Sequence, residues 1–167
     1  MRVTTPYARL LRWLLGLVCD TARRGVAVQL LVSGPHVQRP AVHRQADRDV
    51  QPLLDAGVDL RRYLPSLLHA KVLTVDGTVA MSGTTNVDVR SLALNEQVDL
   101  VLADPAVVAT LDGHFDEDLA RSARVTAAGW EQRPPTHRAL KVLADVAGRP
   151  LRGLRSLDVA GRSPGMR

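Results

Sequence analysis

Apolar residues along the chain recur with a period of two in some segments and with helical spacing in others. The first spacing indicates a strand, and the second indicates a helix. Strands are expected at residues 1–5, 26–32, 58–63, 68–75, 79–82 and 97–102, and helices at 8–24, 42–56 and 105–122. This order, β-α-β-α-β-β-β-β-α, predicts an α/β or α+β layered domain.

Glycine and proline mark the ends of several of these segments. Gly25 and Gly57 follow the first two helices, where a glycine can take the left-handed backbone that ends a helix. Asp76-Gly77 separates two strand-like runs and is a strong hairpin signal. Pro105 stands at the start of the third helix, where its missing N–H is tolerated.

The pattern weakens towards the carboxyl terminus. A connector is expected at residues 130–135 and a short amphipathic helix at 138–147. The final segment carries Arg149, Arg152, Arg155, Arg162 and Arg167 against only Asp158. Such a composition is typical of a mobile basic tail. The domain is therefore expected at residues 1–147, followed by a flexible tail at 148–167.

Length and composition limit the class of protein. With 167 residues, of which 46% are hydrophobic and 23% charged, the chain suits one globular domain and is too apolar for a disordered one. Its net charge of +5 suits phosphate-bearing partners, whether nucleic acid, phospholipid or an anionic membrane surface. The single cysteine, Cys19, lies in an apolar run and is expected to be buried.

The sequence shows no pattern of a membrane span or a signal peptide. Its most apolar run, residues 10–19, is interrupted by Arg12 and is shorter than the roughly 20 residues that a spanning helix needs. A basic start, apolar run and small-residue cleavage site are not recognisable either. The chain is therefore expected to be cytoplasmic, either soluble or peripheral at the inner face of the membrane.

The stretch that suggests chemistry begins at His69-Ala70-Lys71. On a strand, side chains two apart share a face, so His69 and Lys71 are expected to project together. An imidazole nitrogen can attack phosphorus to form a covalent intermediate, while an ammonium neutralises the phosphoryl oxygens. The pair therefore suits phosphate chemistry.

Four more residues complete this stretch. Asp76 opens the hairpin and is expected to hold the turn rather than to act directly in the chemistry. Gly83 would let the backbone come close to an anion. The Thr84 hydroxyl and the Asn86 amide can donate hydrogen bonds to phosphate oxygens.

At these residues the chain resembles the phospholipase D superfamily, whose HKD signature is H-x-K-x4-D-x6-G-S/T-x-N. The match over residues 69–86 is complete in type and spacing, which makes Asp76 a member of the catalytic motif beside His69 and Lys71. Similarity to the second half of bacterial cardiolipin synthases continues at 4–7, 24–26, 56–58, 68–71, 88, 90–91, 95 and 130–133. It covers about residues 3–145.

The resemblance implies an α/β/α sandwich with a mixed central sheet flanked by helices, no metal or other cofactor, and a phosphohistidine mechanism. The expected substrate is a phosphatidylglycerol-like phospholipid, with glycerol or a second phospholipid as acceptor. Enzymes of the family use two facing motifs, in which one histidine attacks and the other protonates the leaving alcohol. Because this chain carries a single HKD half, a homodimer or a separate first-half chain is expected to supply the other, as in a truncated or split gene product.

The family usually places a glutamate where it orients a catalytic histidine, and the matching position here is Gln97. A neutral amide can hold an imidazole by a hydrogen bond, but it cannot stabilise an imidazolium electrostatically. Reduced activity is therefore expected. The adjacent Glu96 should point to the opposite face unless a bulge turns it round.

Two other functions stay open. A dimeric single-motif nuclease is compatible with the positive charge, although aromatic and basic residues are not interleaved as base stacking requires. The second is that the chain is a catalytically impaired half, or a module that pairs with another chain.

His36, His43 and His114 lack the spacing of a metal site and are expected to be solvated surface residues. Arg90 is expected to form an ordinary ion pair or to contact substrate or a partner subunit.

Overall fold

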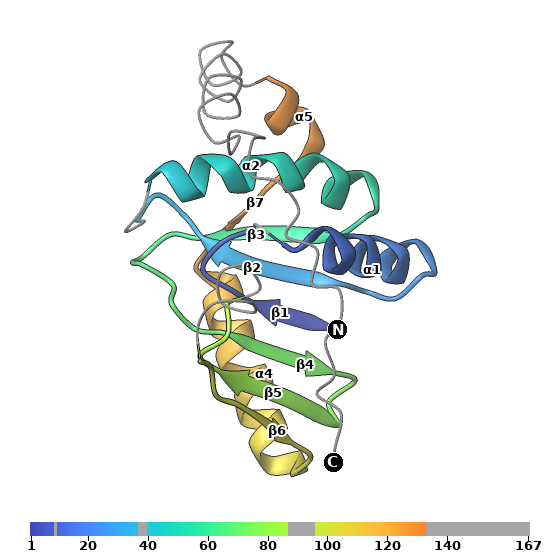
Figure 1. The fold of residues 1–167 in the computed structure, drawn as a ribbon, viewed down its shortest axis with the longest axis vertical. Helices are drawn as coiled ribbons and strands as arrows, with labels where there is room; N and C mark the ends of the chain where they lie inside the picture. Colours follow the sequence, from blue (N-terminus) through green and yellow to red (C-terminus); the bar gives the residue numbers. More distant parts are fainter. Residues whose placement is uncertain (9, 37–39, 87–95, 133–167) are drawn as a thin grey trace, which may run out of the picture.

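The structure is a computed structural model that describes residues 1–8, 10–36, 40–86 and 96–132. In these ranges the chain builds a seven-stranded sheet with helices on both faces (Figure 1). The elements are β1 (Arg2–Thr4), α1 (Arg12–Arg23), β2 (Gln29–Ser33), α2 (Pro40–Asp55), β3 (Asp59–Tyr63), β4 (Val72–Val75), β5 (Val79–Gly83), β6 (Asp99–Leu102), α4 (Pro105–Ala120), β7 (Ser122–Arg124) and α5 (Ala127–Glu131).

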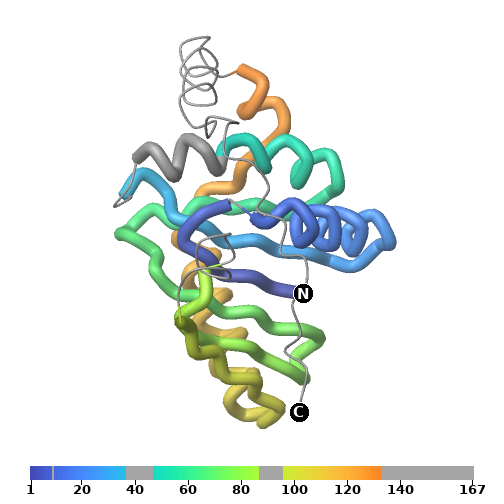
Figure 2. Tube along the Cα trace, in the orientation of Figure 1, coloured from blue at the N-terminus to red at the C-terminus, as the bar shows by residue number. Residues whose placement is uncertain are grey.

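The sheet is mixed, with the strand order β6-β5-β4-β1-β2-β3-β7. Strands β1, β2 and β3 are parallel and are connected through α1 and α2. On one side of them β4, β5 and β6 follow one another as an antiparallel meander, which Figure 2 traces from green to yellow. On the other side β7 pairs antiparallel with β3. Strand β4 therefore meets the parallel half of the sheet through β1.

Two apolar cores lie on opposite faces of the sheet, because successive residues of a strand point to opposite sides. Leu30 belongs to the core under α1 and α2, where it packs with Val18, Leu53 and Leu60. Its neighbour Leu31 belongs to the core under α4. The three-layer α/β/α arrangement that the resemblance implied is confirmed.

Helix α4 is tied to the sheet by polar contacts at its centre. The Thr74 hydroxyl of β4 donates to Asp112 Oδ1 at 2.6 Å. Arg2 of β1 pairs with Asp112 at 3.2 Å and with Asp116 at 3.0 Å, and its guanidinium lies 5.3 Å from the centre of the Phe115 ring. These contacts fix α4 across β1 and β4, behind the strand that follows the His-Lys pair.

Several predicted boundaries were too wide. Helix α1 begins at residue 12 rather than 8, and the amide of Leu10, before the helix, donates to Asp49 of α2 at 3.1 Å. The strand predicted at 26–32 begins at Gln29, because its neighbour β1 is only three residues long and pairs with residues 29–31. Apolar spacing marks which residues are buried, and the length of the neighbouring strand decides how far the ladder extends.

The short elements after α4 were missed. The chain turns at Arg121 into β7, in a stretch predicted as the end of a helix, and α5 occupies part of the predicted connector. Trp130 of α5 lies 5.5 Å from the Arg62 guanidinium, measured to its ring centre. The predicted helix at 138–147 and the basic tail lie outside the described residues. Within the described ranges, no helix combines the length and apolarity needed to cross a bilayer.

Candidate active site

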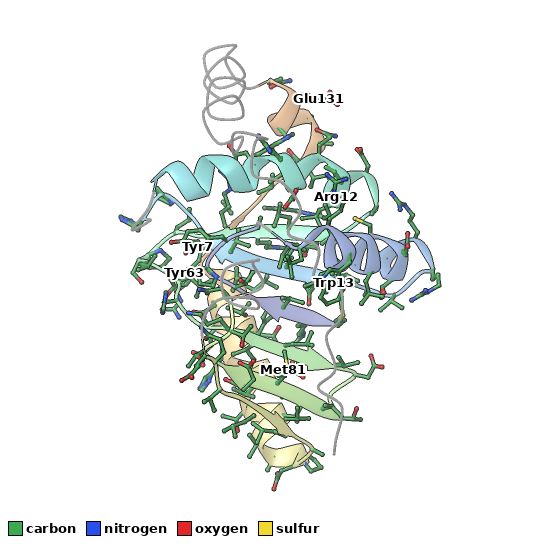
Figure 3. All side chains as sticks on the ribbon, in the orientation of Figure 1. Tyr7, Arg12, Trp13, Tyr63, Met81 and Glu131 are labelled. Carbon is green, nitrogen blue, oxygen red and sulfur yellow. The ribbon has the colours of Figure 1, made fainter. Side chains whose placement is uncertain are left out.

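The His-Lys pair lies at the end of the sheet where β2 and β3 finish. Figure 3 labels Tyr7 and Tyr63 at this end. The buried Ser33, the last residue of β2, donates through its hydroxyl to the Leu68 carbonyl at 2.9 Å. This bond anchors the segment just before His69 to the parallel half of the sheet.

The prediction of a strand over residues 68–75 was wrong for its first half. Residues 67–71 have no regular secondary structure, and β4 begins at Val72. The cause lies in β1, whose last paired residue, Thr4, faces Val72. Beyond it the Thr5 amide turns to the Leu31 carbonyl of β2, and Pro6 has no N–H to offer. His69 and Lys71 therefore sit on a segment that has lost its partner strand on that side.

The His69 and Lys71 side chains nevertheless meet. Lys71 Nζ lies 3.0 Å from His69 Nδ1 and 3.1 Å from Nε2, and it donates to the His69 carbonyl at 2.6 Å. His69 is exposed and Lys71 is half-buried. The donor and acceptor roles of the two ring nitrogens depend on the tautomer, and in a neutral imidazole one of them carries the lone pair that a nucleophile needs.

Burial lowers the pKa of Lys71 by desolvating its ammonium. Among the described residues no carboxylate forms an ion pair with it. The positive charge is therefore available to an incoming anion.

The loop after β5 lies beside this pair. The Gly83 amide donates to the Lys71 carbonyl at 3.2 Å. Thr84 is bonded to the segment before β6. Its amide donates to the Val98 carbonyl at 2.9 Å, and its hydroxyl accepts from the Val98 amide at 3.0 Å and donates to the Val98 carbonyl at 3.4 Å. Asn86 Oδ1 is buried and lacks a hydrogen-bond partner in the described part of the chain. The loop is thus joined to the His-Lys segment through the Gly83 amide, three residues before Asn86.

The remaining motif position lies elsewhere. Asp76 stands in the β4–β5 turn, at the other end of β4 from Lys71, about 16 Å away by the rise of five strand residues. Asp76 and Gly77 both have positive φ, of 52° and 64°, as the centre of a type I′ turn requires. This placement gives Asp76 a part in the hairpin and none in contacts with the His-Lys pair.

Gln97 and Glu96 precede β6, which begins at Asp99 rather than at the predicted residue 97. Gln97 is half-buried and Glu96 is exposed. No hydrogen bond joins either side chain to His69 across the described ranges.

The other singled-out residues are dispersed. His36 and His114 are exposed, while the side chain of His43 and all of Arg90 lie outside the described residues. Where the structure describes side chains, no three His, Cys, Asp or Glu groups gather to hold a metal ion. Cys19 is buried, as predicted, and burial raises the pKa of its thiol.

Sequence reasoning missed two polar residues of the site, Ser33 and Asp99. Ser33 anchors the segment before His69, and the Asp99 carboxylate accepts from the amide and hydroxyl of Thr85. The only signal for Ser33 is a hydroxyl at the end of a buried strand. Nothing in the sequence near Asp99 marks its role, because its partner Thr85 lies fourteen residues away.

The fold and site together define an α/β/α domain that presents a histidine-lysine pair at one end of a mixed sheet, which is the phospholipase D fold. The sequence matches the family described as "Cardiolipin synthase, PLD-like domain" over residues 1–119. The chain belongs to this family.

Curated relatives and solved structures are consistent with that assignment. The chain is 38% identical over 142 residues to cardiolipin synthase A of Serratia proteamaculans, and equally to that of Yersinia pestis, covering 84% of this chain and 29% of each relative. It thus spans less than a third of their length. The fold resembles Nuc, a phospholipase D family member from Salmonella typhimurium, with a TM-score of 0.66 at 17% identity over 75% of this chain and 81% of that one. The fold also resembles phosphatidylserine synthase of Haemophilus influenzae, with a TM-score of 0.69 at 16% identity over 87% of this chain and 39% of that one.

Proposed function

We propose that this domain transfers phosphatidyl groups in the manner of a cardiolipin synthase, through a phosphohistidine formed on His69. One observation carries the proposal: the half-buried Lys71 ammonium touches both ring nitrogens of the exposed His69. Nucleophile and charge-stabilising groups are then already together at a position that a phosphodiester can reach.

In the first step a His69 ring nitrogen attacks the phosphorus of a phosphodiester. The N–P bond forms while the P–O bond to the leaving alcohol breaks, and the leaving oxygen takes a proton from a general acid. Lys71 and Asn86, assisted by the Thr84 hydroxyl, bind the phosphoryl oxygens. These groups are most useful in the transition state, when negative charge on the oxygens is greatest.

In the second step an acceptor alcohol or water attacks the phosphohistidine, the N–P bond breaks, and the acceptor's proton returns to the general acid. A second HKD motif in trans would supply that acid through its own histidine, either from a second copy of this chain or from a separate first-half chain. Asp76 supports this chemistry indirectly by shaping the hairpin, and Gln97 at the histidine-orienting position would limit the rate.

A phosphatidylglycerol-like lipid is the proposed substrate. The support is the 38% identity to cardiolipin synthase A and a net charge of +5, which favours an anionic lipid surface. Peripheral attachment at the inner face of the membrane, with the domain in the cytoplasm, is part of the same proposal.

The test is to incubate the purified chain with phosphatidylglycerol vesicles and, separately, with supercoiled plasmid. Each incubation is done with the chain alone and with the first-half domain of the Serratia proteamaculans cardiolipin synthase A added. Lipid products are followed by mass spectrometry and nicking by gel. Lipid turnover in either arrangement is expected. Plasmid nicking without lipid turnover, or neither activity, would contradict the proposal.

The lowered pKa of Lys71 predicts an alkaline fall in activity. The desolvated ammonium loses its proton at a lower pH than an exposed lysine, and the neutral amine cannot neutralise phosphoryl oxygens. The value of kcat/KM should therefore be high below that pKa and decrease as pH rises through it. Lys71→Arg should move this fall to higher pH, since a guanidinium stays charged up to about pH 12. A pH–rate profile with the same alkaline limb in both proteins would exclude Lys71 as its origin.

A further inference from the structure

Asp99 and Gly83 face each other across the β5–β6 ladder at very close range. A Cβ placed on Gly83 would lie 2.0 Å from Asp99 Oδ1 and 2.3 Å from the Val98 carbonyl oxygen. The Asp99 side chain therefore occupies the space that any other residue at position 83 would fill. The sequence predicted that Gly83 lets an anion come close to the backbone. In the structure the anionic group that comes close is the Asp99 carboxylate.

The Asp99 carboxylate passes over Gly83 and contacts Thr85, two residues further along the chain. The Thr85 amide donates to Asp99 Oδ1 at 3.2 Å, and the Thr85 hydroxyl donates to Oδ2. Both oxygens of one carboxylate are thus engaged by the residue between Thr84 and Asn86. A bidentate contact of this kind fixes the direction of a backbone segment as well as its position.

The loop that Asp99 contacts is also hydrogen-bonded to the His-Lys segment. Gly83 binds the Lys71 carbonyl through its amide, so the carboxylate, the loop and the His-Lys segment form one hydrogen-bonded unit. No ion pair joins Asp99 and Lys71 within the described residues, and burial is the cause of the lowered pKa of Lys71. The carboxylate holds the loop without neutralising the ammonium.

We propose that Asp99, acting through Thr85, is the positioning residue that holds the loop after β5 and so places the Asn86 carboxamide at the substrate phosphate. The role is distinct from that of the histidine-orienting position at Gln97, because the partner of Asp99 is the loop. The inference rests on the proposed phosphatidyl transfer for its kinetic consequences. Its binding consequence, weaker phosphate affinity when the loop is released, does not require turnover.

Because Asp99 is exposed, a positioning role can be told apart from a purely structural one. Asp99 lies on the edge strand β6 and is exposed, so breaking its contact with Thr85 should lower the Tm by no more than about 4 °C. Misplacing a group that binds the transition state by about 1 Å can cost on the order of 100-fold in rate. A positioning role therefore predicts a large kinetic effect with a small effect on stability.

The experiment compares Asp99→Ala, Thr85→Val, the double variant and Thr85→Ser with the unchanged chain. Asp20→Ala, which removes an exposed carboxylate paired with Arg23 on α1, is the matched control. The measurements are kcat and KM on phosphatidylglycerol vesicles, the Tm, and the Kd for inorganic phosphate by NMR titration. We expect Asp99→Ala and Thr85→Val each to lower kcat about 10- to 100-fold with little change in KM. The double variant should be no worse than Asp99→Ala alone, since Asp99→Ala already removes the hydroxyl bond that Thr85→Val removes, together with the bond from the Thr85 amide.

Thr85→Ser keeps the hydroxyl, so it should stay within about twofold of the unchanged chain, and Asp20→Ala should match it as well. If neither the chain alone nor its mixture with a first half turns over lipid, the proposed function fails. The positioning role is then judged on phosphate affinity, which Asp99→Ala should weaken at least about fivefold. Additive single effects, or kinetic and affinity losses that merely follow a loss of folded protein, would overturn the role of Asp99.

Discussion

Replacing His69 by alanine is expected to abolish lipid turnover. The imidazole supplies the bond to phosphorus, and no neighbouring group among the described residues can take its place, so kcat should fall by at least about 10³-fold. Because His69 is exposed, its removal leaves no cavity, and the Tm should stay near that of the unchanged chain. Product formation by mass spectrometry and a thermal melt measure the two quantities.

His114→Ala is the control for this change. His114 is also exposed and stands on α4, and no hydrogen bond joins it to His69 or Lys71 among the described residues. Its replacement should leave kcat within about twofold of the starting value, as most surface substitutions do. Lipid turnover that survives in His69→Ala would remove the phosphohistidine from the mechanism.

Mixing the inactive variant with the unchanged chain tests whether two copies build one site. If each site needs a His69 from both copies and the copies exchange freely, an equal mixture should keep about a quarter of the activity. A site complete within one chain should keep about half. A retained half would therefore contradict the arrangement in trans as a homodimer.

Gly83→Ala is expected to cost both stability and activity. The new methyl group would meet Asp99 Oδ1 at 2.0 Å and the Val98 carbonyl oxygen at 2.3 Å. The second of these atoms belongs to the backbone and cannot turn away. Overpacking of this kind costs about 1–3 kcal/mol of unfolding free energy. Opening the β5–β6 ladder would also release Thr84, so turnover should be lost beyond what instability explains.

Gly113→Ala provides the matched control, because a Cβ at that position of α4 meets nothing within 4 Å. Alanine in a helix interior is favoured over glycine by about 0.5–1 kcal/mol, so this variant should be slightly more stable. Urea titrations of both variants measure the difference. Equal stability of the two alanine variants would show that the close approach at Gly83 is not as the structure has it.

The order of helices and strands up to α4 could be predicted from the sequence, and the structure explains why the boundaries could not. Strand β4 was expected from residue 68 because its apolar positions alternate. It begins at Val72 because β1 ends at Thr4 and Pro6 has no N–H to extend the pairing. Strand β7 was missed for the same reason, since it owes its existence to the free edge of β3. Local pattern records burial, whereas a strand also needs a partner that lies far away in sequence.

The candidate site divides in a similar way. His69, Lys71, Gly83, Thr84 and Asn86 stand out in the sequence because their types and spacing form a motif. Ser33 and Asp99 do not, because they contribute through single contacts with Leu68 and Thr85 that span 35 and 14 residues. Asp76 stands out equally, and its place in the hairpin, which the Asp76-Gly77 pair predicted, is confirmed by the positive φ of both residues.

The sequence by itself determined the family, the layered architecture and the residues capable of attacking and binding a phosphate, because these depend on residue type and on spacing along the chain. Only the tertiary structure decided that the His-Lys pair lies off the strand and that the Lys71 ammonium is desolvated against the imidazole. It also revealed that a carboxylate from β6 holds the loop after β5 across a glycine. These features arise where separate segments meet, and their contact energies depend on distances that a linear pattern does not contain.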